Sequence, residues 1–337
     1  MLEPREYSKR LGVLRHEQLQ AALDRFALGE LIAASPAPSG LFGQNVMLTS
    51  SSGEYVLRGA PWPAWQLPHE RYIAEWIHTR TPVPAPWPYR IDLATDIFGW
   101  SYAVMPRLPG IFLTDHSAFM ALPPDDRLGI ARAMGEALAA LHGAPFTATA
   151  QYNPARECFE PIGRSYPEWF RAYVGDWLQR CRLASSATTE ADVAWVESLL
   201  SDAAAALAVP FAPALVHHDY KENNLVFQRD AAGRWRVAGI FDLMECSVAE
   251  GEYDLARFFT AHAVDRPELT QEFLDAYASV RGLRPGFAER FRLYLATDRL
   301  IIWEYGQRQG GWFSPGLGFR EWAEPGVSAR WAARPAG

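Results

Sequence analysis

The chain has 337 residues, of which 49% are hydrophobic and 21% charged, so its length favours two domains or lobes with ample material for a core. Its net charge of −7 argues against a nucleic-acid-binding protein that relies on a basic surface. A membrane-spanning helix needs about eighteen consecutive apolar residues, and no apolar run in the sequence is that long. The start, MLEPREYSKR, contains no apolar segment of a secretory signal, and the three cysteines lie far apart. We therefore expect a cytoplasmic protein without a disulfide framework or a structural zinc site.

A helix followed by strands is expected at the beginning of the chain. Residues 15–28 place Leu19, Leu23 and Phe26 on one helical face, and Gly29 suits the end of that helix. The segments ELIAAS, NVMLTS and EYVLR have the composition of strands. The turn SSSG between the last two predicts a hairpin.

The next segments continue this first region. HERYIAEWIHTR carries Tyr72, Ile73, Trp76 and Ile77 at helical spacing, and the proline-rich connector TPVPAPWP follows it. SYAVMPRLPG is expected to be a strand that ends in a hinge over residues 106–110.

The remainder is predicted to be mainly helical. Helical patterns occupy DDRLGIARAMGEALAALHG, EADVAWVESLLSDAAAALA, ELTQEFLDAYASV and FAERFRLYLATDRLIIWEYGQ, with short strands in ALVHHD, NLVF and RWRVAGIFD. The sequence thus predicts an α+β protein with a small strand-rich N-lobe and a larger, mainly helical C-lobe. We place the N-lobe at 1–105, the hinge at 106–110, the C-lobe at 111–325 and a tail at 326–337.

The segment LVHHDYKENNLVF gathers residues that can carry chemistry. It contains His217, Asp219, Lys221 and Asn224, and a second acid, Asp242, follows Asn224 by 18 positions. Apolar strand residues precede both aspartates. An isolated H-x-D has little meaning, but this longer pattern rarely arises by chance.

The pattern H-x-D-x-x-x-x-N followed by a strand-borne Asp resembles the catalytic core of the kinase-like phosphotransferases, most closely the aminoglycoside phosphotransferase and choline kinase group. GEYDLARFF, with Asp254, resembles the D-P-x-x-D-L-A segment of that group, in which the Asp holds the catalytic loop. YVLR, HERYIAEWI and SYAVMPRLPG fall where the group has a small-lobe strand, its first helix and its hinge. The resemblance covers about residues 28–310 and implies a two-lobed protein-kinase-like fold with ATP or GTP and Mg²⁺ as cofactors.

The resemblance also implies roles for the loop residues. Asp219 would accept or orient the hydroxyl of the acceptor, His217 would brace the loop, and Asn224 and Asp242 would offer hard oxygen ligands to Mg²⁺. HHDYKENN is similar to the H-R-D-x-K-x-x-N loop of protein kinases, in which the lysine touches the γ-phosphate. The same role for Lys221 is a hypothesis, which gains some weight because only two of the 32 basic residues are lysines.

Arg58 and Glu70 match the basic residue and the acid that the family places on its third strand and next helix. Arg58 stands where lysine is usual, and its planar fork still neutralises phosphate. The alternative is an ordinary surface ion pair.

A phosphate-binding loop is expected over SGLFGQN, with Gly40, Gly43, Gln44 and Asn45 as candidate contacts. The segment is not G-x-G-x-x-G, so a plain turn is the alternative. Met105, beside the hinge, is a further candidate for the nucleotide site.

The acceptor is expected to be a small molecule. The segment between Asp242 and Asp254 is too short for the activation loop of a protein kinase, and no A-P-E follows. YVLR, the position of Glu245 as the third residue after Asp242, and the overall length are more similar to hygromycin-type aminoglycoside phosphotransferases than to choline kinases. Carboxylates and aromatic rings on the late helices suit a cationic acceptor: Asp298, Trp303, Glu304, Tyr305 and Trp312.

The sequence therefore predicts an ATP- and Mg²⁺-dependent O-phosphotransferase, most closely of the aminoglycoside type, with antibiotic resistance as a candidate biological role. Transfer would be direct and in line, without a phosphoenzyme. The alternatives are a metabolic kinase for choline, homoserine, a sugar or a fructosamine, then a non-catalytic nucleotide-binding scaffold, then a protein kinase. We expect a monomer or homodimer whose partner is a hydroxyl-bearing small molecule, not a nucleic acid or a membrane.

Overall fold

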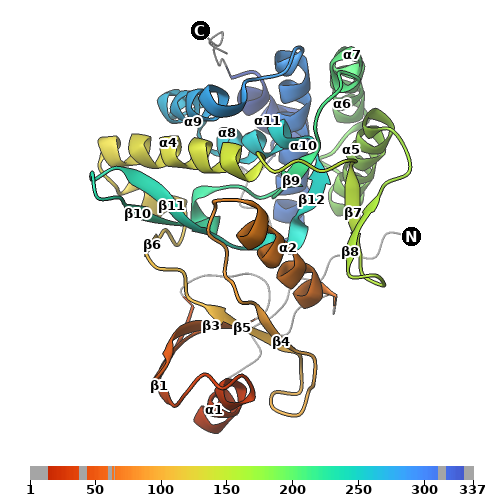
Figure 1. Ribbon diagram of the computed structural model, residues 1–337. Helices are drawn as coiled ribbons and strands as arrows, with labels where there is room; N and C mark the ends of the chain where they lie inside the picture. The colour runs from red at the N-terminus through yellow and green to blue at the C-terminus, as the bar shows by residue number, and fades with distance from the viewer. Residues whose placement is uncertain (1–13, 38–43, 60–62, 64, 310–315, 330–337) are drawn as a thin grey trace. The chain divides into compact units, whose positions relative to one another are not determined.

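The computed structural model describes residues 14–37, 44–59, 63, 65–309 and 316–329 (Figure 1). Contacts between residues divide the chain into two units. Unit 1 consists of Met1–Leu122, Tyr152–Phe159 and Glu222–Cys246. Unit 2 consists of Pro123–Gln151, Glu160–Lys221 and Ser247–Gly337. The segment Glu222–Cys246, which was expected in the C-lobe, thus belongs to the same unit as the beginning of the chain. The lobe boundaries drawn from the sequence remain a prediction.

Unit 1 contains a five-stranded sheet in the order β1-β2-β3-β5-β4. Its strands are β1 (Leu31–Pro36), β2 (Gln44–Ser50), β3 (Gly53–Gly59), β4 (Arg90–Asp92) and β5 (Tyr102–Pro106). All four pairings are antiparallel. β2 and β3 pair with Val46 opposite Leu57 and Ser50 opposite Gly53, which confirms the predicted hairpin.

Helix α1 (His16–Arg25) packs on this sheet and supplies part of its core. Leu19 and Leu23 are buried, as the helical periodicity predicts, whereas Phe26 follows the helix and is only partly buried. The sheet contributes alternating apolar positions to the same core, since side chains two residues apart share a face. These core residues are Val46, Leu48, Leu57, Tyr102 and Val104.

Unit 1 continues with α2 (Gln66–Arg80), on which Ile73 and Ile77 are fully buried. A second sheet has the order β11-β10-β6. It consists of β6 (Ile111–Phe112), β10 (Leu225–Arg229) and β11 (Trp235–Ile240), accompanied by α3 (His116–Met120) and the short helices η1 (Glu222–Asn224) and η2 (Leu243–Glu245). The strands NLVF and RWRVAGIFD were predicted, and their antiparallel pairing places Leu225 opposite Ile240.

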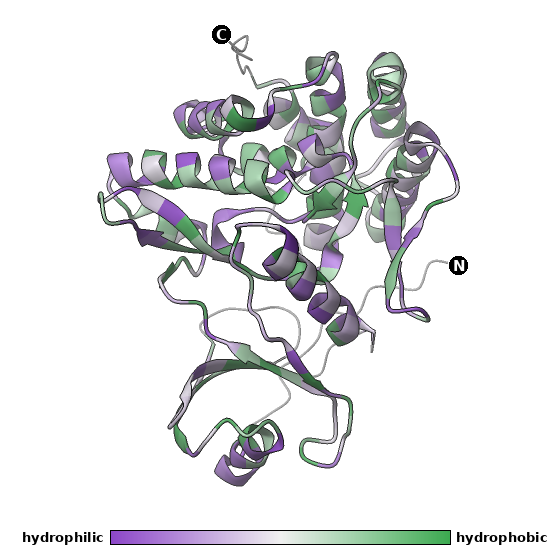
Figure 2. Cartoon of the chain, in the orientation of Figure 1, coloured by the Kyte–Doolittle hydropathy of each residue, from purple (hydrophilic) through white to green (hydrophobic). Residues whose placement is uncertain are grey.

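Unit 2 is mainly helical. Its helices are α4 (Pro124–Leu141), α5 (Tyr166–Ala184), α6 (Glu190–Asp202), α7 (Ala204–Leu207), η3 (Gly251–Asp254), α8 (Leu255–His262), α9 (Pro267–Arg281), α10 (Phe287–Arg308) and α11 (Phe319–Val327). A further sheet has the order β8-β7-β12-β9 and consists of β7 (Ala150–Asn153), β8 (Cys158–Pro161), β9 (Ala214–Val216) and β12 (Ser247–Ala249). The segment Tyr152–Phe159, which includes parts of β7 and β8, is grouped with unit 1. α4 shows alternating hydrophobic and hydrophilic bands in Figure 2, as expected for a helix with one buried face.

The packing of α4 against α9 depends on a glycine. A Cβ atom at Gly135 would lie 2.3 Å from the carbonyl oxygen of Phe273, closer than any side chain tolerates. Glycine therefore lets the two helix backbones approach each other at this point.

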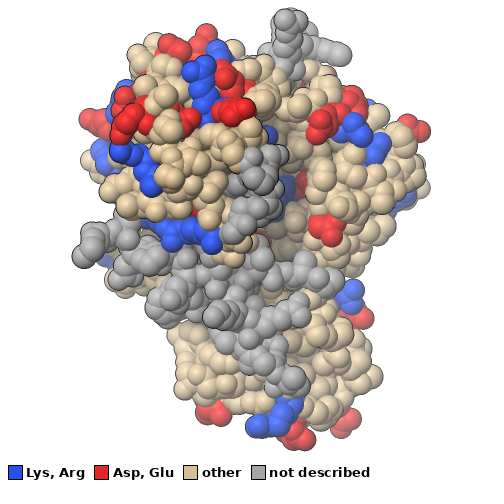
Figure 3. Space-filling model, turned by 180° about the vertical axis from the view of Figure 1, so that it is seen from behind, with Lys and Arg blue, Asp and Glu red and all other residues tan. Residues whose placement is uncertain are grey.

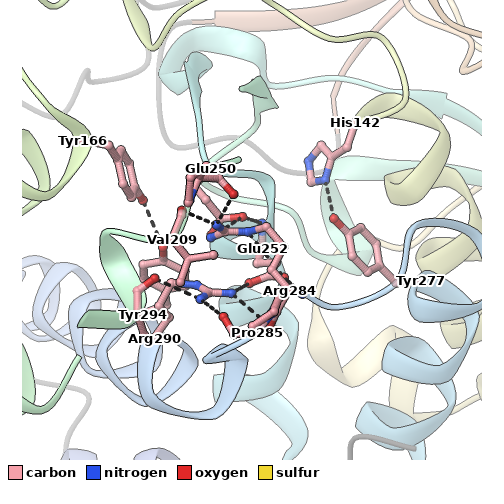
Figure 4. A network of polar contacts seen from close by, with 12 residues as sticks. His142, Tyr166, Val209, Glu250, Glu252, Tyr277, Arg284, Pro285, Arg290 and Tyr294 are labelled. Atoms are coloured by element: carbon pink, nitrogen blue, oxygen red, sulfur yellow. Dashed lines mark hydrogen bonds and ion pairs between the residues drawn. The ribbon is translucent and has the colours of Figure 1, made fainter. Parts of the chain in front are cut away.

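A buried network of charges joins η3 to the beginning of α10 (Figure 4). Arg290 Nη2 lies 2.6 Å from Glu252 Oε2, and Arg284 Nη2 lies 3.4 Å from Glu250 Oε1. Burial, together with the charge of Glu252, raises the pKa of Glu250 to about 7. Removing one partner from such a network leaves an uncompensated charge in the interior and costs about 3–5 kcal/mol.

The exposed charges are mixed in sign, and on the face seen in Figure 3 acidic and basic side chains are interspersed. Arg132 and Glu272, whose Nε and Oε1 lie 2.5 Å apart, are one example of such a surface pair. Pairs of this kind contribute little to stability. Among the described helices, none is both long and apolar enough to cross a membrane.

Candidate functional site

In unit 2, the loop after β9 is held by one buried carboxylate. Asp254 Oδ2 accepts the backbone N–H of His217 and Oδ1 accepts that of His218, each at 2.7 Å. His142 Nε2 lies 3.2 Å from Asp254 Oδ2. Burial alone would raise the pKa of Asp254, but the hydrogen bond with His142 and the neighbouring histidines hold that pKa below its usual value. Asp254 therefore fixes the loop, including the left-handed backbone of His218 at φ 66°.

This loop presents Asp219 between two cations. Lys221 Nζ lies 2.8 Å from Asp219 Oδ2, and Arg257 Nε lies 2.8 Å from Asp219 Oδ1. The backbone N–H of Asp219 donates to Nδ1 of the buried His217 at 3.3 Å, a contact that a brace of the loop would make. Burial opposes ionisation of Asp219, but Lys221 and Arg257 outweigh it and lower its pKa. The carboxylate is thus ionised and has a defined position.

In unit 1, the pairing of β10 with β11 brings Asn224, just before β10, into the same region as Asp242, just after β11. The backbone N–H of Phe241 donates to the carbonyl of Asn224 at 3.2 Å, so Asp242 directly follows the partner of Asn224. Asp242 has φ 61° and ψ 56°, a left-handed conformation that aspartate adopts more readily than most residues. Their amide and carboxylate oxygens belong to the ligand class that Mg²⁺ prefers, so these residues fit such an ion.

Arg58 and Glu70, predicted as a pair, form an ion pair of 2.9 Å between Nη2 and Oε1 within unit 1. Tyr89 Oη donates to Glu70 Oε2 at 2.7 Å, and Gln66 Nε2 donates to Oε1 at 2.6 Å. The side chains of Arg58 and Glu70 are 13% and 4% exposed, which excludes an ordinary surface pair. Although burial opposes the charge of Arg58, the carboxylates of Glu70 and Asp242, the latter 3.5 Å away, raise its pKa.

The other nucleotide-site candidates are only partly described. Gly40 and Gly43 lie outside the described residues. Gln44 begins β2, and Asn45 lies opposite Arg58 in the pairing of β2 with β3. Met105 is buried in β5.

The candidate acceptor contacts on α10 already have partners inside unit 2. Asp298 Oδ2 accepts from Thr260 Oγ1 at 2.5 Å, and the indole N–H of Trp303 donates to Thr188 Oγ1 at 2.9 Å. Glu304 pairs with Arg308, one turn further along the helix. These three side chains are buried, whereas Tyr305 on the same helix is half-buried. Contact of any of them with an acceptor remains a prediction, and Trp312 lies outside the described residues. Glu245 is exposed on η2 in unit 1.

Arg257 was not among the site residues predicted from the sequence. It lies on α8, three residues after Asp254, in the GEYDLARFF segment used for the resemblance. A basic residue one helical turn after the Asp that holds the loop was the available signal.

His69 on α2 was also not singled out. It is 3% exposed and its ring stacks on Tyr152 with centroids 4.3 Å apart. Burial lowers its pKa to about 4, against the opposing effect of the carbonyls of Cys246 and Met244. His69 therefore stays neutral in the folded protein.

We expect this neutral histidine to make stability depend on pH. His69 takes up a proton near pH 6.5 in the unfolded chain but only near pH 4 in the folded one. Its contribution to the free energy of unfolding is therefore fully present above about pH 6.5 and is lost as the pH falls towards 4, by on the order of 3 kcal/mol. Denaturant unfolding of the wild type and of His69→Phe across this range measures the effect. His78→Phe, on the same helix, is the control, and an equal pH slope in wild type and His69→Phe would contradict the expectation.

Comparison with known sequences identifies a family. Residues 33–290 match the sequence model described as "Phosphotransferase enzyme family". The homoserine kinase of Cupriavidus taiwanensis is 26% identical over 291 residues, which are 82% of this chain and 80% of that protein.

Solved structures show the fold. Aminoglycoside phosphotransferase APH(4)-Ia, as a thermostable mutant in ternary complex with ADP and hygromycin B, matches with a TM-score of 0.63 and 14% identity, covering 92% of this chain and 97% of that one. APH(2")-IIIa in complex with GDP and kanamycin matches with a TM-score of 0.62 and 14% identity, covering 93% and 96%. The predicted α+β, kinase-like fold class is thereby confirmed.

Proposed function

Because the chain belongs to the phosphotransferase enzyme family and is a small-molecule kinase with a hydroxyl acceptor, we propose that it is an ATP- and Mg²⁺-dependent O-phosphotransferase for a cationic acceptor of the aminoglycoside type. One observation carries this proposal. The carboxylate of Asp219 is held 2.8 Å from both Lys221 and Arg257, on a loop fixed by Asp254. That arrangement suits a base that must be ionised and accurately placed.

Each residue has a proposed part in direct, in-line transfer. Asp219 accepts the proton of the acceptor hydroxyl as the oxygen attacks the γ-phosphorus and the bond to the leaving diphosphate breaks. Arg58, oriented by Glu70, neutralises phosphate charge. Asn224 and Asp242 would hold Mg²⁺, which supplies further positive charge to the phosphates. Lys221 is proposed to approach the γ-phosphate when the nucleotide is bound.

The acceptor class rests on charge and on relatives. Glu245 offers an exposed carboxylate three residues after Asp242. APH(4)-Ia and APH(2")-IIIa, named above, bind hygromycin B and kanamycin. Both are amine-bearing polyols, and an acidic side chain suits such cations.

Homoserine is the second candidate, because the sequence match to a homoserine kinase covers 82% of the chain. Homoserine is also an amino alcohol, so both candidates carry a hydroxyl and a charged amine in one molecule. It differs by its carboxylate and its size.

A panel assay tests the acceptor class. Release of ADP or GDP would be followed with Mg²⁺-ATP or Mg²⁺-GTP and hygromycin B, kanamycin, homoserine, choline, a fructosamine and simple sugars. Stimulation by the aminoglycosides supports the first candidate, and stimulation by homoserine alone replaces it with the second. Nucleotide binding without turnover on any acceptor would support the scaffold alternative.

We expect Arg58→Gln to weaken nucleotide binding by about 10- to 100-fold, since a charge-assisted contact to phosphate is worth about 1.5–3 kcal/mol. Calorimetric titration with Mg²⁺-ATP measures the loss. Arg107→Gln, which removes an exposed arginine that pairs with Glu54 in unit 1, is the matched control. Equal affinities of Arg58→Gln and wild type would remove Arg58 from the nucleotide site.

A further inference from the structure

We propose that Arg257 and Asp298 are positioning residues for Asp219. The contacts in unit 2 form a carboxylate–arginine–carboxylate bridge from Asp298 through Arg257 to Asp219, which orients the base against a rigid helix. This inference rests on the proposed function, in which Asp219 is the base, and it gives Asp298 a different role from the acceptor contact predicted from the sequence.

The geometry of Arg257 supports the bridge. Its Nε lies 2.8 Å from Asp219 Oδ1 and its Nη1 lies 3.1 Å from Asp298 Oδ1, so one guanidinium engages both acids. The side chain of Arg257 is only 15% exposed. Because the guanidinium forms an ion pair at two of its edges, both carboxylates restrain its position beside Asp219.

Asp298 anchors the other end. It lies on α10, its side chain is 2% exposed, and Oδ2 accepts from Thr260 Oγ1 at 2.5 Å. Thr260 belongs to α8, the helix that carries Arg257, so Asp298 contacts two residues of that helix. A buried carboxylate is costly unless it is paired and hydrogen-bonded, and Asp298 meets both conditions.

The exposed fraction of the side chains increases along the bridge from Asp298 to Asp219. The side chains of Asp298, Arg257 and Asp219 are 2%, 15% and 22% exposed, so the bridge leads from the interior of unit 2 to a more accessible carboxylate. Lys221, the other cation on Asp219, is 33% exposed and sits on a flexible four-carbon stem. Arg257 is therefore the contact of Asp219 that the surrounding structure holds in place.

Among the described charged and titratable groups of unit 2, Lys221, Arg257 and His217 lower the pKa of Asp219. Removing Arg257 deletes one of two close cations, whereas Arg257→Lys keeps the charge but cannot engage both acids. Charge and orientation can thus be separated by two variants at one position.

The test compares Arg257→Gln, Arg257→Lys and Asp298→Asn. We expect kcat to fall about 10- to 100-fold in Arg257→Gln and less in the other two, with the nucleotide KM unchanged, because a misplaced reacting group costs up to about 100-fold. The acid limb of the kcat–pH profile should move to higher pH in Arg257→Gln and stay in Arg257→Lys. Glu272→Gln, which removes the ion-pair partner of the exposed Arg132, is the control and should have the kcat of the wild type.

A second readout does not need turnover. Carbon-13 NMR titration of the Asp219 carboxyl, assigned with Asp219→Asn, follows its pKa in the protein without acceptor. That pKa should rise in Arg257→Gln and remain low in Arg257→Lys. If no acceptor is phosphorylated by the wild type, the proposed function fails, and this titration still decides whether the bridge controls Asp219.

Two results would overturn the inference. One is an Arg257→Gln variant with wild-type kcat and an unchanged Asp219 titration. The other is a loss of kcat that Glu272→Gln reproduces. Circular dichroism checks that each variant folds, and if Asp298→Asn does not, Thr260→Val weakens the same anchor while keeping the charge.

Discussion

Replacing Asp219 by asparagine is expected to lower kcat by about 10²- to 10⁴-fold, the usual contribution of a positioned general base. The amide keeps the size of the side chain but cannot accept the proton of the attacking hydroxyl. It also removes the charge that pairs with Lys221 and Arg257, each 2.8 Å away. Steady-state release of the nucleoside diphosphate with the preferred acceptor measures the loss.

Nucleotide affinity separates this effect from a general defect, because the candidate phosphate contact, Arg58, belongs to unit 1. The Kd for Mg²⁺-ATP should stay within a few-fold of wild type. Asp202→Asn makes the same acid-to-amide change at an exposed position on α6 and should be fully active. An Asp219→Asn variant that keeps more than about one tenth of the activity would show that Asp219 is not the base.

Asp254→Ala should destabilise the protein by about 3–5 kcal/mol and abolish activity with it. Asp254 is 1% exposed and accepts the backbone N–H groups of both His217 and His218, besides contacting His142. Its loss leaves these donors buried without an acceptor, each a substantial penalty. Denaturant unfolding measures the change.

If the alanine variant does not fold, Asp254→Asn tests the same expectation. The amide keeps one acceptor oxygen, so the loss should be intermediate, and amide hydrogen exchange at His217 and His218 should become faster than in the wild type. A loss of less than about 1 kcal/mol in either variant would mean that the loop keeps its shape without this carboxylate.

Much of the fold follows from local pattern. The β2–β3 hairpin is encoded by alternating apolar residues around a Ser/Gly turn, and α4, α6, α9 and α10 by helical periodicity. α5 was missed, although its start carries the signal Ser165 followed by Glu168, which form a capping box in the structure. α8 was missed for a different reason: it is only eight residues long, so the helical spacing of Leu255, Phe258 and Phe259 covers too short a stretch to stand out in the sequence.

Only those site residues that form a pattern of fixed spacing along the chain could be predicted from the sequence. Asp219, Asn224 and Asp242 belong to a contiguous pattern, but the contact between Arg257 and Asp219 joins a loop to a helix 38 positions later, and no local rule encodes it. The acids of α10 show the converse. Asp298 and Glu304 were expected to contact an acceptor, but α10 packs against α5, α6, α8 and α11, and both acids are buried in ion pairs.

The way in which unit 1 is assembled from separate stretches of chain constrains the order of its biosynthesis. Its second sheet needs β6, made early, and β10 and β11, which lie within Glu222–Cys246. A ribosome must therefore complete α4, α5, α6 and α7 of unit 2 before the final strands of unit 1 emerge. Unit 1 cannot finish folding first, as amino-terminal domains commonly do. Nor would a fragment that stops before Glu222 be a smaller version of it, because β6 would have lost the strand with which it pairs.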